Sequence, residues 1–215
     1  MSEDAHRRDV VEVARRLYAK GLIGGNEGNV SLRDGERLYV TPGGVCKGFL
    51  APGDVVATDL EGRPLSGGHA SSEIQMHVAV YRGRPDVTAV VHAHPPVATG
   101  FAVAQVPLDR PVLAEPVVTL GPVPVVPFGT PSTSELAERV AAAIPTAHAL
   151  LLANHGALTV GETLWRAWER METLEQYARI ALVARLLGSP HELSSEAVSA
   201  LEALRGPAGY PPPRA

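Results

Sequence analysis

The sequence contains little cysteine and lysine, and each shortage excludes a class of protein. Cys46 is the only cysteine among 215 residues, so neither an internal disulfide nor a thiolate metal cluster can form. Only two lysines, Lys20 and Lys47, accompany 17 arginines, and the formal net charge is −4. Without an excess of basic residues, the composition predicts no nucleic-acid partner.

Long apolar runs are also missing. No stretch approaches the roughly 18 apolar residues of a transmembrane helix, and the polar residues 1–8 do not resemble a signal peptide. We therefore expect no membrane partner and a cytoplasmic protein, which agrees with the single cysteine. The length and the hydrophobic content of 45% suit one domain over residues 1–215, with the proline-rich residues 206–215 as a flexible tail.

A pair of histidines stands at the end of an apolar run. Residues 87–91 predict a buried strand that leads into His92-Ala93-His94. Because side chains alternate along a strand, His92 and His94 point the same way from positions roughly 6.5 Å apart. Two imidazoles placed in this way can bind one metal ion about 2.0–2.1 Å from their nitrogens.

A third histidine follows a second apolar strand. Residues 149–153 predict that strand, which ends in Asn154-His155-Gly156. Three histidines with a fourth position open to water or substrate are typical of a catalytic zinc site. The spacing alone leaves an alternative open, in which each histidine only satisfies backbone groups at the end of its strand.

Helices and short strands alternate along the rest of the chain. Apolar periodicity predicts helices over residues 3–20, 95–105, 135–144, 162–187 and 192–204. Strands are expected over residues 30–33, 37–40, 54–60 and 157–160, and edge strand and loop over 107–127. Asp34-Gly35 predicts a hairpin turn, so the first two strands pair antiparallel.

Three polar segments have features of a phosphate site. Glycine-rich loops at residues 24–29 and 41–44 flank the hairpin, and backbone N–H groups in such loops can converge on an anion. Ser71-Ser72-Glu73 precedes a helical pattern, and the N-terminus of a helix also favours phosphate. Taken singly, each segment is equally compatible with an ordinary turn or cap. For His77, one helical turn after Glu73, a structural role is expected.

Five motifs, in this order and at these intervals, resemble the class II aldolase/adducin family, most closely its zinc-dependent L-fuculose-1-phosphate aldolases. The motifs are Gly28-Asn29-Val30-Ser31, Thr41-Pro42-Gly43-Gly44, Ser71-Ser72-Glu73, His92-Ala93-His94 and Asn154-His155-Gly156. The resemblance covers nearly the whole chain. It implies a single three-layer α/β/α domain with a largely antiparallel central sheet, assembled as a homotetramer with active sites between subunits.

The resemblance implies that His92, His94 and His155 bind one Zn²⁺ per subunit and that Glu73 is the catalytic acid/base. The expected reaction is the reversible cleavage of a ketose 1-phosphate, of the L-fuculose 1-phosphate type, into dihydroxyacetone phosphate and a small aldehyde such as L-lactaldehyde. A divalent cation would stabilise the enediolate that forms when the carbon–carbon bond breaks. Glu73 would exchange a proton with the carbon that carries the charge.

The resemblance also assigns the binding of the substrate phosphate to four residues, Asn29, Gly44, Ser71 and Ser72. Gly43 stands where close relatives often carry a hydroxyl residue, so only its backbone N–H remains available there. Lys47 follows this loop, and it either reaches the phosphate or is a solvated surface lysine. The sequence leaves that choice open.

Other reactions of the same family remain as alternatives. The aldolase relatives use tyrosines of a neighbouring subunit on the C4 hydroxyl, yet residues 111–115 contain none, which leaves Tyr210 in the tail. A ribulose-phosphate 4-epimerase is ranked lower, because the region that supplies its aspartate corresponds to residues 115–120, which have no aspartate. A sugar-phosphate dehydratase or decarboxylase is also open. An adducin-type binding module would lack the three histidines.

Overall fold

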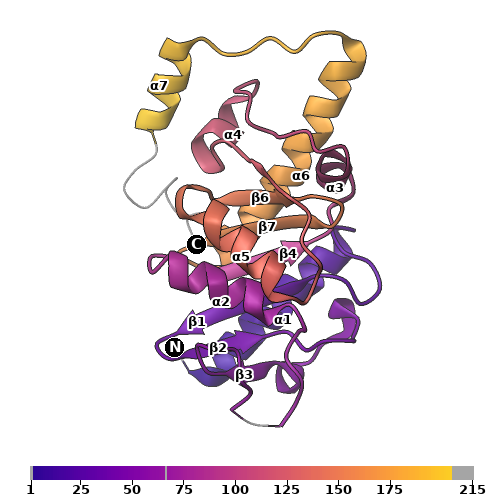
Figure 1. Cartoon of the computed structure of the whole chain (residues 1–215), viewed down its shortest axis with the longest axis vertical. Helices are drawn as coiled ribbons and strands as arrows, with labels where there is room; N and C mark the ends of the chain where they lie inside the picture. Colours follow the sequence, from indigo (N-terminus) through magenta and orange to yellow (C-terminus); the bar gives the residue numbers. More distant parts are fainter. Residues whose placement is uncertain (1, 66, 205–215) are drawn as a thin grey trace.

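Seven α-helices and seven β-strands make up the part of the chain that the computed structural model describes, residues 2–65 and 67–204 (Figure 1). The helices are α1 (Glu3–Ala19), α2 (Ile74–Gly83), α3 (Pro96–Val103), α4 (Ala114–Thr119), α5 (Ser134–Ala143), α6 (Leu164–Leu187) and α7 (Ser195–Ala203). The strands are β1 (Asn29–Asp34), β2 (Arg37–Val40), β3 (Val56–Thr58), β4 (Ala89–Ala93), β5 (Val125–Val126), β6 (Ala149–Leu152) and β7 (Gly156–Gly161).

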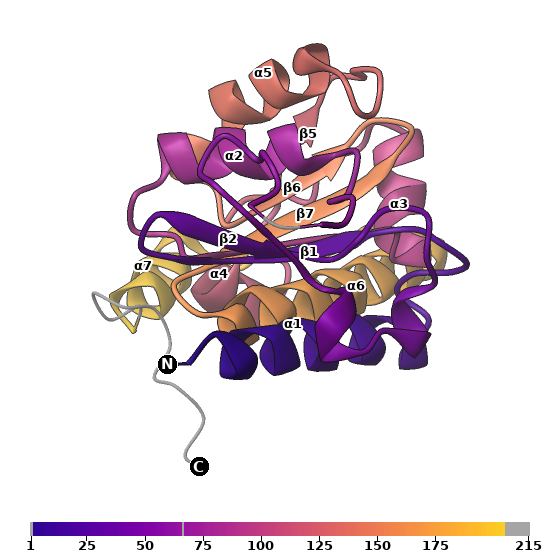
Figure 2. The same ribbon diagram turned by 90° about the horizontal axis from the view of Figure 1, so that it is seen from below.

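The elements form three layers (Figure 2). The middle layer is one sheet with the strand order β3-β2-β1-β4-β7-β6-β5, in which only β5 and β6 pair in parallel. Helices α1, α3 and α6 cover one face of the sheet, and α2 and α5 cover the other. The predicted α/β/α fold with a largely antiparallel sheet is therefore confirmed.

The two faces of the sheet bury separate apolar cores. Val10, Leu17 and Met171 of α1 and α6 belong to one cluster, whereas Val80 and Val140 of α2 and α5 belong to the other. The apolar stripe of α6 thus packs in the core, as its periodicity predicts. Because helices cover both faces, the central strand β4 is buried along its whole length.

Two segments differ from the sequence prediction. Residues 107–127, predicted as edge strand and loop, contain the helix α4 and only a two-residue strand, β5. Pro116 lies in the first turn of α4, where a missing N–H costs no helical hydrogen bond, so the proline did not exclude a helix. The strand expected over 54–60 is shorter, because Pro52–Asp54 forms a 3₁₀ turn. The tail 206–215, with Tyr210, lies outside the described residues.

Antiparallel pairing brings three chain segments to the same end of the sheet. Asn29 at the start of β1 lies opposite His92 of β4, and His92 lies opposite Leu158 of β7. The start of β1, the end of β4 and the turn before β7 therefore meet. The motifs that resemble the aldolase family lie on these segments and on the loops beside them.

Candidate metal centre and active site

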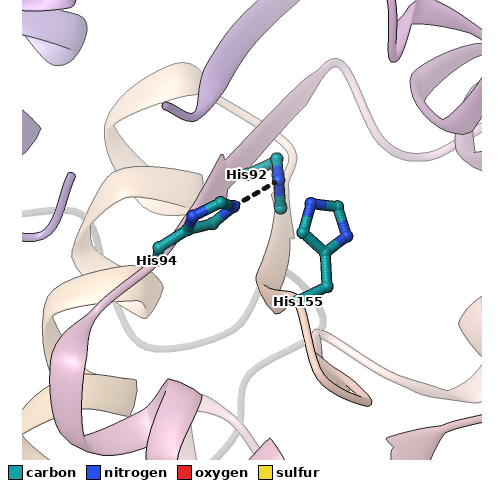
Figure 3. Close-up of side chains that lie close together, drawn as sticks. All are labelled: His92, His94 and His155. Atoms are coloured by element: carbon teal, nitrogen blue, oxygen red, sulfur yellow. Dashed lines mark hydrogen bonds between the residues drawn. The ribbon is translucent and has the colours of Figure 1, made fainter. Parts of the chain in front are cut away.

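The three histidines predicted as metal ligands converge at this end of the sheet (Figure 3). His92 lies in β4, His94 directly follows it, and His155 lies in the turn between β6 and β7. The ring centroids are 5.0 Å apart for His92 and His94, 4.7 Å for His92 and His155, and 5.0 Å for His94 and His155. One nitrogen of each ring lies within 4.8 Å of the others.

In two of these rings, the nitrogen that faces away from the site, Nδ1, has a protein partner. Nδ1 of His92 donates a hydrogen bond to the carbonyl oxygen of Ala157 at 2.9 Å. Nδ1 of His94 faces the carboxylate of Glu27 at 3.6 Å. A proton held at Nδ1 leaves the lone pair on Nε2 free, and this tautomer is the one that metal binding requires. The surroundings therefore orient both rings with Nε2 directed into the site.

Two glycines allow the chain to approach these histidines closely. A Cβ atom at Gly156 would lie 2.5 Å from Cδ2 of His94 and 2.6 Å from the carbonyl oxygen of Ala93. Gly28 has a φ of +67°, and a Cβ atom there would lie 2.8 Å from the carbonyl oxygen of His92. Larger residues at either position would displace a strand end that carries a histidine.

Glu73 lies across from the histidines, at the cap position before α2. Its Oε2 is 3.3 Å from Nε2 of His92, and its Oε1 is 3.3 Å from Nε2 of His155. Oε2 also accepts a hydrogen bond from Nδ2 of Asn29 at 2.8 Å. Burial raises the pKa of Glu73, but His92, His155 and Asn29 together hold that pKa below its usual range. The carboxylate is therefore ionised at neutral pH.

The donor atoms and their spacing fit a divalent cation. Two ligands about 2.0–2.1 Å from a tetrahedral zinc lie roughly 3.3 Å apart. The Nε2 atoms of His92 and His94 are 3.2 Å apart, and Glu73 lies at 3.3 Å from two of the rings. Oε1 of Glu73 is buried without a hydrogen-bond partner among the described residues, an arrangement that a bound cation would stabilise.

The protonation of the ring nitrogens also suits a metal. Burial, with the neighbouring His92, lowers the pKa of His94 and lowers the pKa of His155 to about 4. Both rings are therefore neutral near pH 7 and can act as ligands without first losing a proton.

The segments expected to bind phosphate lie beside Glu73. The backbone N–H of Ser71 donates to the carbonyl of Thr41 at 3.1 Å, which holds the second glycine-rich loop against the start of α2. A Cβ atom at Gly43 would lie 3.6 Å from Cα of Ser71, and Gly44 has a φ of +71°. The loops that carry Asn29, Gly44, Ser71 and Ser72 therefore come together, with Asn29 joined to Glu73 directly.

Two further residues contact this region: Ser132, which the sequence did not indicate, and Lys47, whose role the sequence left open. Ser132, from the loop before α5, donates from Oγ to Oγ of Ser72 at 2.8 Å and has a φ of +64°. Lys47 is only 1% exposed, so it is not a solvated surface lysine. Its Nζ donates to carbonyl oxygens of Val45 and Asn26, one in each region flanking the hairpin. The contacts of Ser132 with Ser72 and of Lys47 with Asn26 join residues far apart in sequence, which is why spacing did not reveal them.

Comparison with known proteins identifies the family. A sequence model of the class II aldolase and adducin N-terminal domain matches residues 8–182. The chain belongs to this family. An L-fuculose phosphate aldolase of Methanococcus maripaludis is 33% identical over 172 residues, which cover 80% of this chain and 93% of that protein. A 3-oxo-tetronate 4-phosphate decarboxylase of Escherichia coli is 35% identical over 188 residues, which cover 84% of this chain and 88% of that protein.

The fold comparison agrees with the sequence match. A solved structure of an L-fuculose 1-phosphate aldolase superposes with a TM-score of 0.89 at 30% identity, covering 94% of this chain and 97% of that one. The protein is thus an enzyme of the class II aldolase family, whose members depend on a metal and act on sugar phosphates. A pure binding role of the adducin type is not supported. Within residues 2–65 and 67–204, no helix has the length and apolar character needed to span a membrane.

Proposed function

We propose that this protein is a zinc-dependent aldolase that reversibly cleaves a ketose 1-phosphate, of the L-fuculose 1-phosphate type, into dihydroxyacetone phosphate and a small aldehyde such as L-lactaldehyde. The observation that carries the proposal is the convergence of three imidazole nitrogens on one ionised carboxylate, with a 3.2 Å separation between the Nε2 atoms of His92 and His94. Three nitrogens and an oxygen are donors that zinc commonly takes in catalytic sites.

In this proposal His92, His94 and His155 hold the metal, which when bound supplies a Lewis acid for the negative charge that develops on the substrate carbonyl. Glu73 performs the proton transfer. In the synthetic direction its ionised carboxylate removes a proton from the carbon next to the carbonyl of dihydroxyacetone phosphate, and in cleavage it returns that proton. Asn29 fixes the carboxylate through the 2.8 Å hydrogen bond to Oε2.

Asn29, Gly44, Ser71 and Ser72 are proposed to bind the phosphate group. Their backbone and side-chain donors lie on the loops beside Glu73, so a bound phosphate would place the reacting carbons near the carboxylate. The Oγ of Ser71 already accepts a hydrogen bond from the backbone N–H of Glu73 at 3.3 Å, and its own hydroxyl hydrogen can still be donated to the phosphate. Ser132 donates its hydroxyl hydrogen to Oγ of Ser72, which leaves the hydroxyl hydrogen of Ser72 available for the phosphate.

A homotetramer with active sites between subunits is part of the proposal, as is a cytoplasmic location. Leu186 and Leu187 at the end of α6 are 77% and 85% exposed, and exposed apolar rows are typical of contact surfaces. The single cysteine, Cys46, suits a reducing compartment. Light scattering coupled to gel filtration tests the oligomer, and a monomer under all conditions would contradict it.

A second candidate is the decarboxylation of a 3-oxo acid phosphate, and one observation favours it. Cleavage by an aldolase also requires a group that takes the proton of the C4 hydroxyl, whereas loss of CO₂ needs no such group. Residues 111–115, where the family resemblance expects the tyrosine that a neighbouring subunit would supply, contain none. A four-carbon 3-oxo acid 4-phosphate would give CO₂ and the same dihydroxyacetone phosphate.

The deciding experiment identifies the products, because the aldolase, the decarboxylase and the epimerase reactions each give a different one. Purified protein is incubated with L-fuculose 1-phosphate, L-ribulose 5-phosphate or 3-oxo-tetronate 4-phosphate, with and without chelator, and dihydroxyacetone phosphate, aldehyde, epimer and CO₂ are measured. The proposal expects chelator-sensitive aldehyde and dihydroxyacetone phosphate from L-fuculose 1-phosphate. Release of CO₂ without aldehyde favours the decarboxylase, and an epimer without cleavage favours the epimerase.

The substitution Glu73→Gln tests the assigned proton transfer. A positioned general acid/base contributes typically 10²- to 10⁴-fold, so we expect a rate loss of about that size. Bound zinc is expected to remain at one per subunit when zinc is supplied in excess. Glu138→Gln, an exposed glutamate on α5, is the matched control and should leave the rate unchanged. A Glu73→Gln variant with full activity would remove Glu73 from the mechanism.

A further inference from the structure

A line of buried polar side chains runs between α2 and β1, from Tyr81 to Glu73. The hydroxyl of Tyr81 lies 2.6 Å from Oγ of Ser31, and that Oγ lies 2.6 Å from Nδ1 of His77. Nε2 of His77 is 2.5 Å from Oδ1 of Asn29, whose Nδ2 donates to Glu73 at 2.8 Å. Ser31, His77 and Asn29 are almost completely buried, so water does not compete for these bonds.

The chemistry of the groups fixes the direction of every bond in this line. An ionised carboxylate only accepts hydrogen bonds, so Asn29 must turn its Nδ2 toward Glu73 and its Oδ1 toward His77. His77 must then donate from Nε2, which leaves Nδ1 as an acceptor for the Ser31 hydroxyl. Ser31 in turn accepts from Tyr81. All donors therefore point toward Glu73.

A neutral ring at His77 is consistent with this direction. Complete burial, with a further contribution from the nearby His92, lowers the pKa of His77 to about 3. The ring therefore carries a single proton at neutral pH, and the hydrogen bond from Ser31 places that proton on Nε2.

We propose that His77 is a positioning residue that locks the side-chain amide of Asn29 in one orientation, with both Nδ2 hydrogens facing Glu73 and the bound substrate. One of these hydrogens bonds to Glu73. The other is free to reach the substrate phosphate. This inference rests on the proposed roles of Asn29 and Glu73 and adds a residue for which the sequence indicated only a structural role.

The opposite orientation of the Asn29 amide would be unfavourable for both Glu73 and the phosphate. If Asn29 rotated by half a turn, its Oδ1 would face the carboxylate of Glu73 and the anionic phosphate. Oxygen against oxygen is repulsive, and Glu73 would lose its hydrogen bond from this amide. A protein without a donor at His77 would hold the amide only through its bond to Glu73 and would leave Oδ1 buried and unpaired, so the turned orientation would be populated more often.

Two substitutions at His77 separate positioning from simple filling of space. His77→Gln keeps an N–H donor at similar reach, whereas His77→Leu fills similar volume without a donor. We expect His77→Leu to lower both kcat and zinc affinity by about 10- to 100-fold, the range known for groups that orient metal-site residues. His77→Gln should restore both values to within about threefold of the natural protein. Tyr81→Phe removes only the far end of the line and should have a smaller effect than His77→Leu.

Three readouts are needed besides kcat, and none of them depends on the reaction. Nuclear magnetic resonance of the full-length, zinc-loaded protein should show a slowly exchanging Nε2 proton on His77, and chelator competition gives the zinc affinity. Urea unfolding gives the loss of stability for each variant. The inference is overturned if the proton resides on Nδ1, or if kcat and zinc affinity fall equally in the Gln and Leu variants. If L-fuculose 1-phosphate is not cleaved but the proton and the zinc affinities behave as stated, the proposed function fails and the positioning role stands.

Discussion

Nζ of Lys47 lies 3.2 Å from the carbonyl oxygen of Asn26, so a buried ammonium group joins the two glycine-rich loops that border the site. The same Nζ donates to the carbonyl oxygen of Val45 at 2.8 Å. Burial lowers the pKa of Lys47, although the nearby Cys46 and Glu73 oppose that shift. The buried lysine therefore holds the two loops together through these hydrogen bonds and does not lie on the protein surface.

Replacement of this lysine is expected to loosen both loops. Lys47→Met keeps the length of the side chain but leaves the carbonyl oxygens of Asn26 and Val45 without their charged donor, and we expect a loss of about 1–3 kcal/mol in unfolding free energy. Lys20→Met is the matched control, because Lys20 is an exposed lysine paired with Glu172. Its effect should stay within about 0.5 kcal/mol in urea unfolding. Equal losses in the two variants would contradict the structural role of Lys47.

We expect the metal content to depend on the histidine cluster. Elemental analysis of the natural protein is expected to find one zinc per subunit, and His155→Gln should weaken zinc binding at least about 100-fold because one of three nitrogen ligands is lost. His191→Gln removes an exposed histidine outside the cluster and should bind zinc normally. Full zinc content in the His155→Gln protein, measured against a competing chelator, would exclude this ring from the site.

The close packing at Gly156 predicts that even a small side chain there lowers stability and zinc affinity. An added methyl group would lie 2.5 Å from the ring of His94, so Gly156→Ala should cost about 1–3 kcal/mol of stability and weaken zinc binding. Gly100, inside α3, has open space around its Cβ position, and Gly100→Ala should raise stability by about 0.5–1 kcal/mol. Thermal unfolding with and without zinc compares the two. A Gly156→Ala protein as stable as the natural one would show that His94 can move aside freely.

The acid sensitivity of the metal-free protein should depend on His77. Its pKa is about 3 in the folded protein and near 6.5 in the unfolded chain, so the unfolded chain binds more protons between these values. Stability is therefore complete above pH 6.5 and falls as the pH is lowered toward 3, by up to about 1.4 kcal/mol per pH unit.

Urea unfolding of chelator-treated protein at pH 7, 6 and 5 measures this slope. His77→Gln cannot gain the proton, so its stability should change less with pH than that of the natural protein. His94 and His155 titrate in both proteins alike, and the difference between the two slopes belongs to His77. Identical slopes would show that folding leaves the pKa of His77 unchanged.

Much of the site followed from local sequence patterns. Alternation along a strand predicts that His92 and His94 share a face, and the structure places their Nε2 atoms 3.2 Å apart. The five motifs together pointed to the family that the match over residues 8–182 confirms. The helix α4 was missed because Pro116 and its neighbouring prolines read as a break in structure, although the first turn of a helix accepts proline.

What the sequence by itself determined is most of the order of elements, the family and the set of chemical groups, since periodicity and motif spacing are properties of neighbouring residues. Only the tertiary structure decided which groups are buried and which atoms face one another. The line from Tyr81 to Glu73 and the position of Lys47 depend on strand register and loop packing across many residues. Burial then sets the protonation of His77 and the orientation of Asn29, because a hydrogen bond shielded from water tolerates only one arrangement of donor and acceptor.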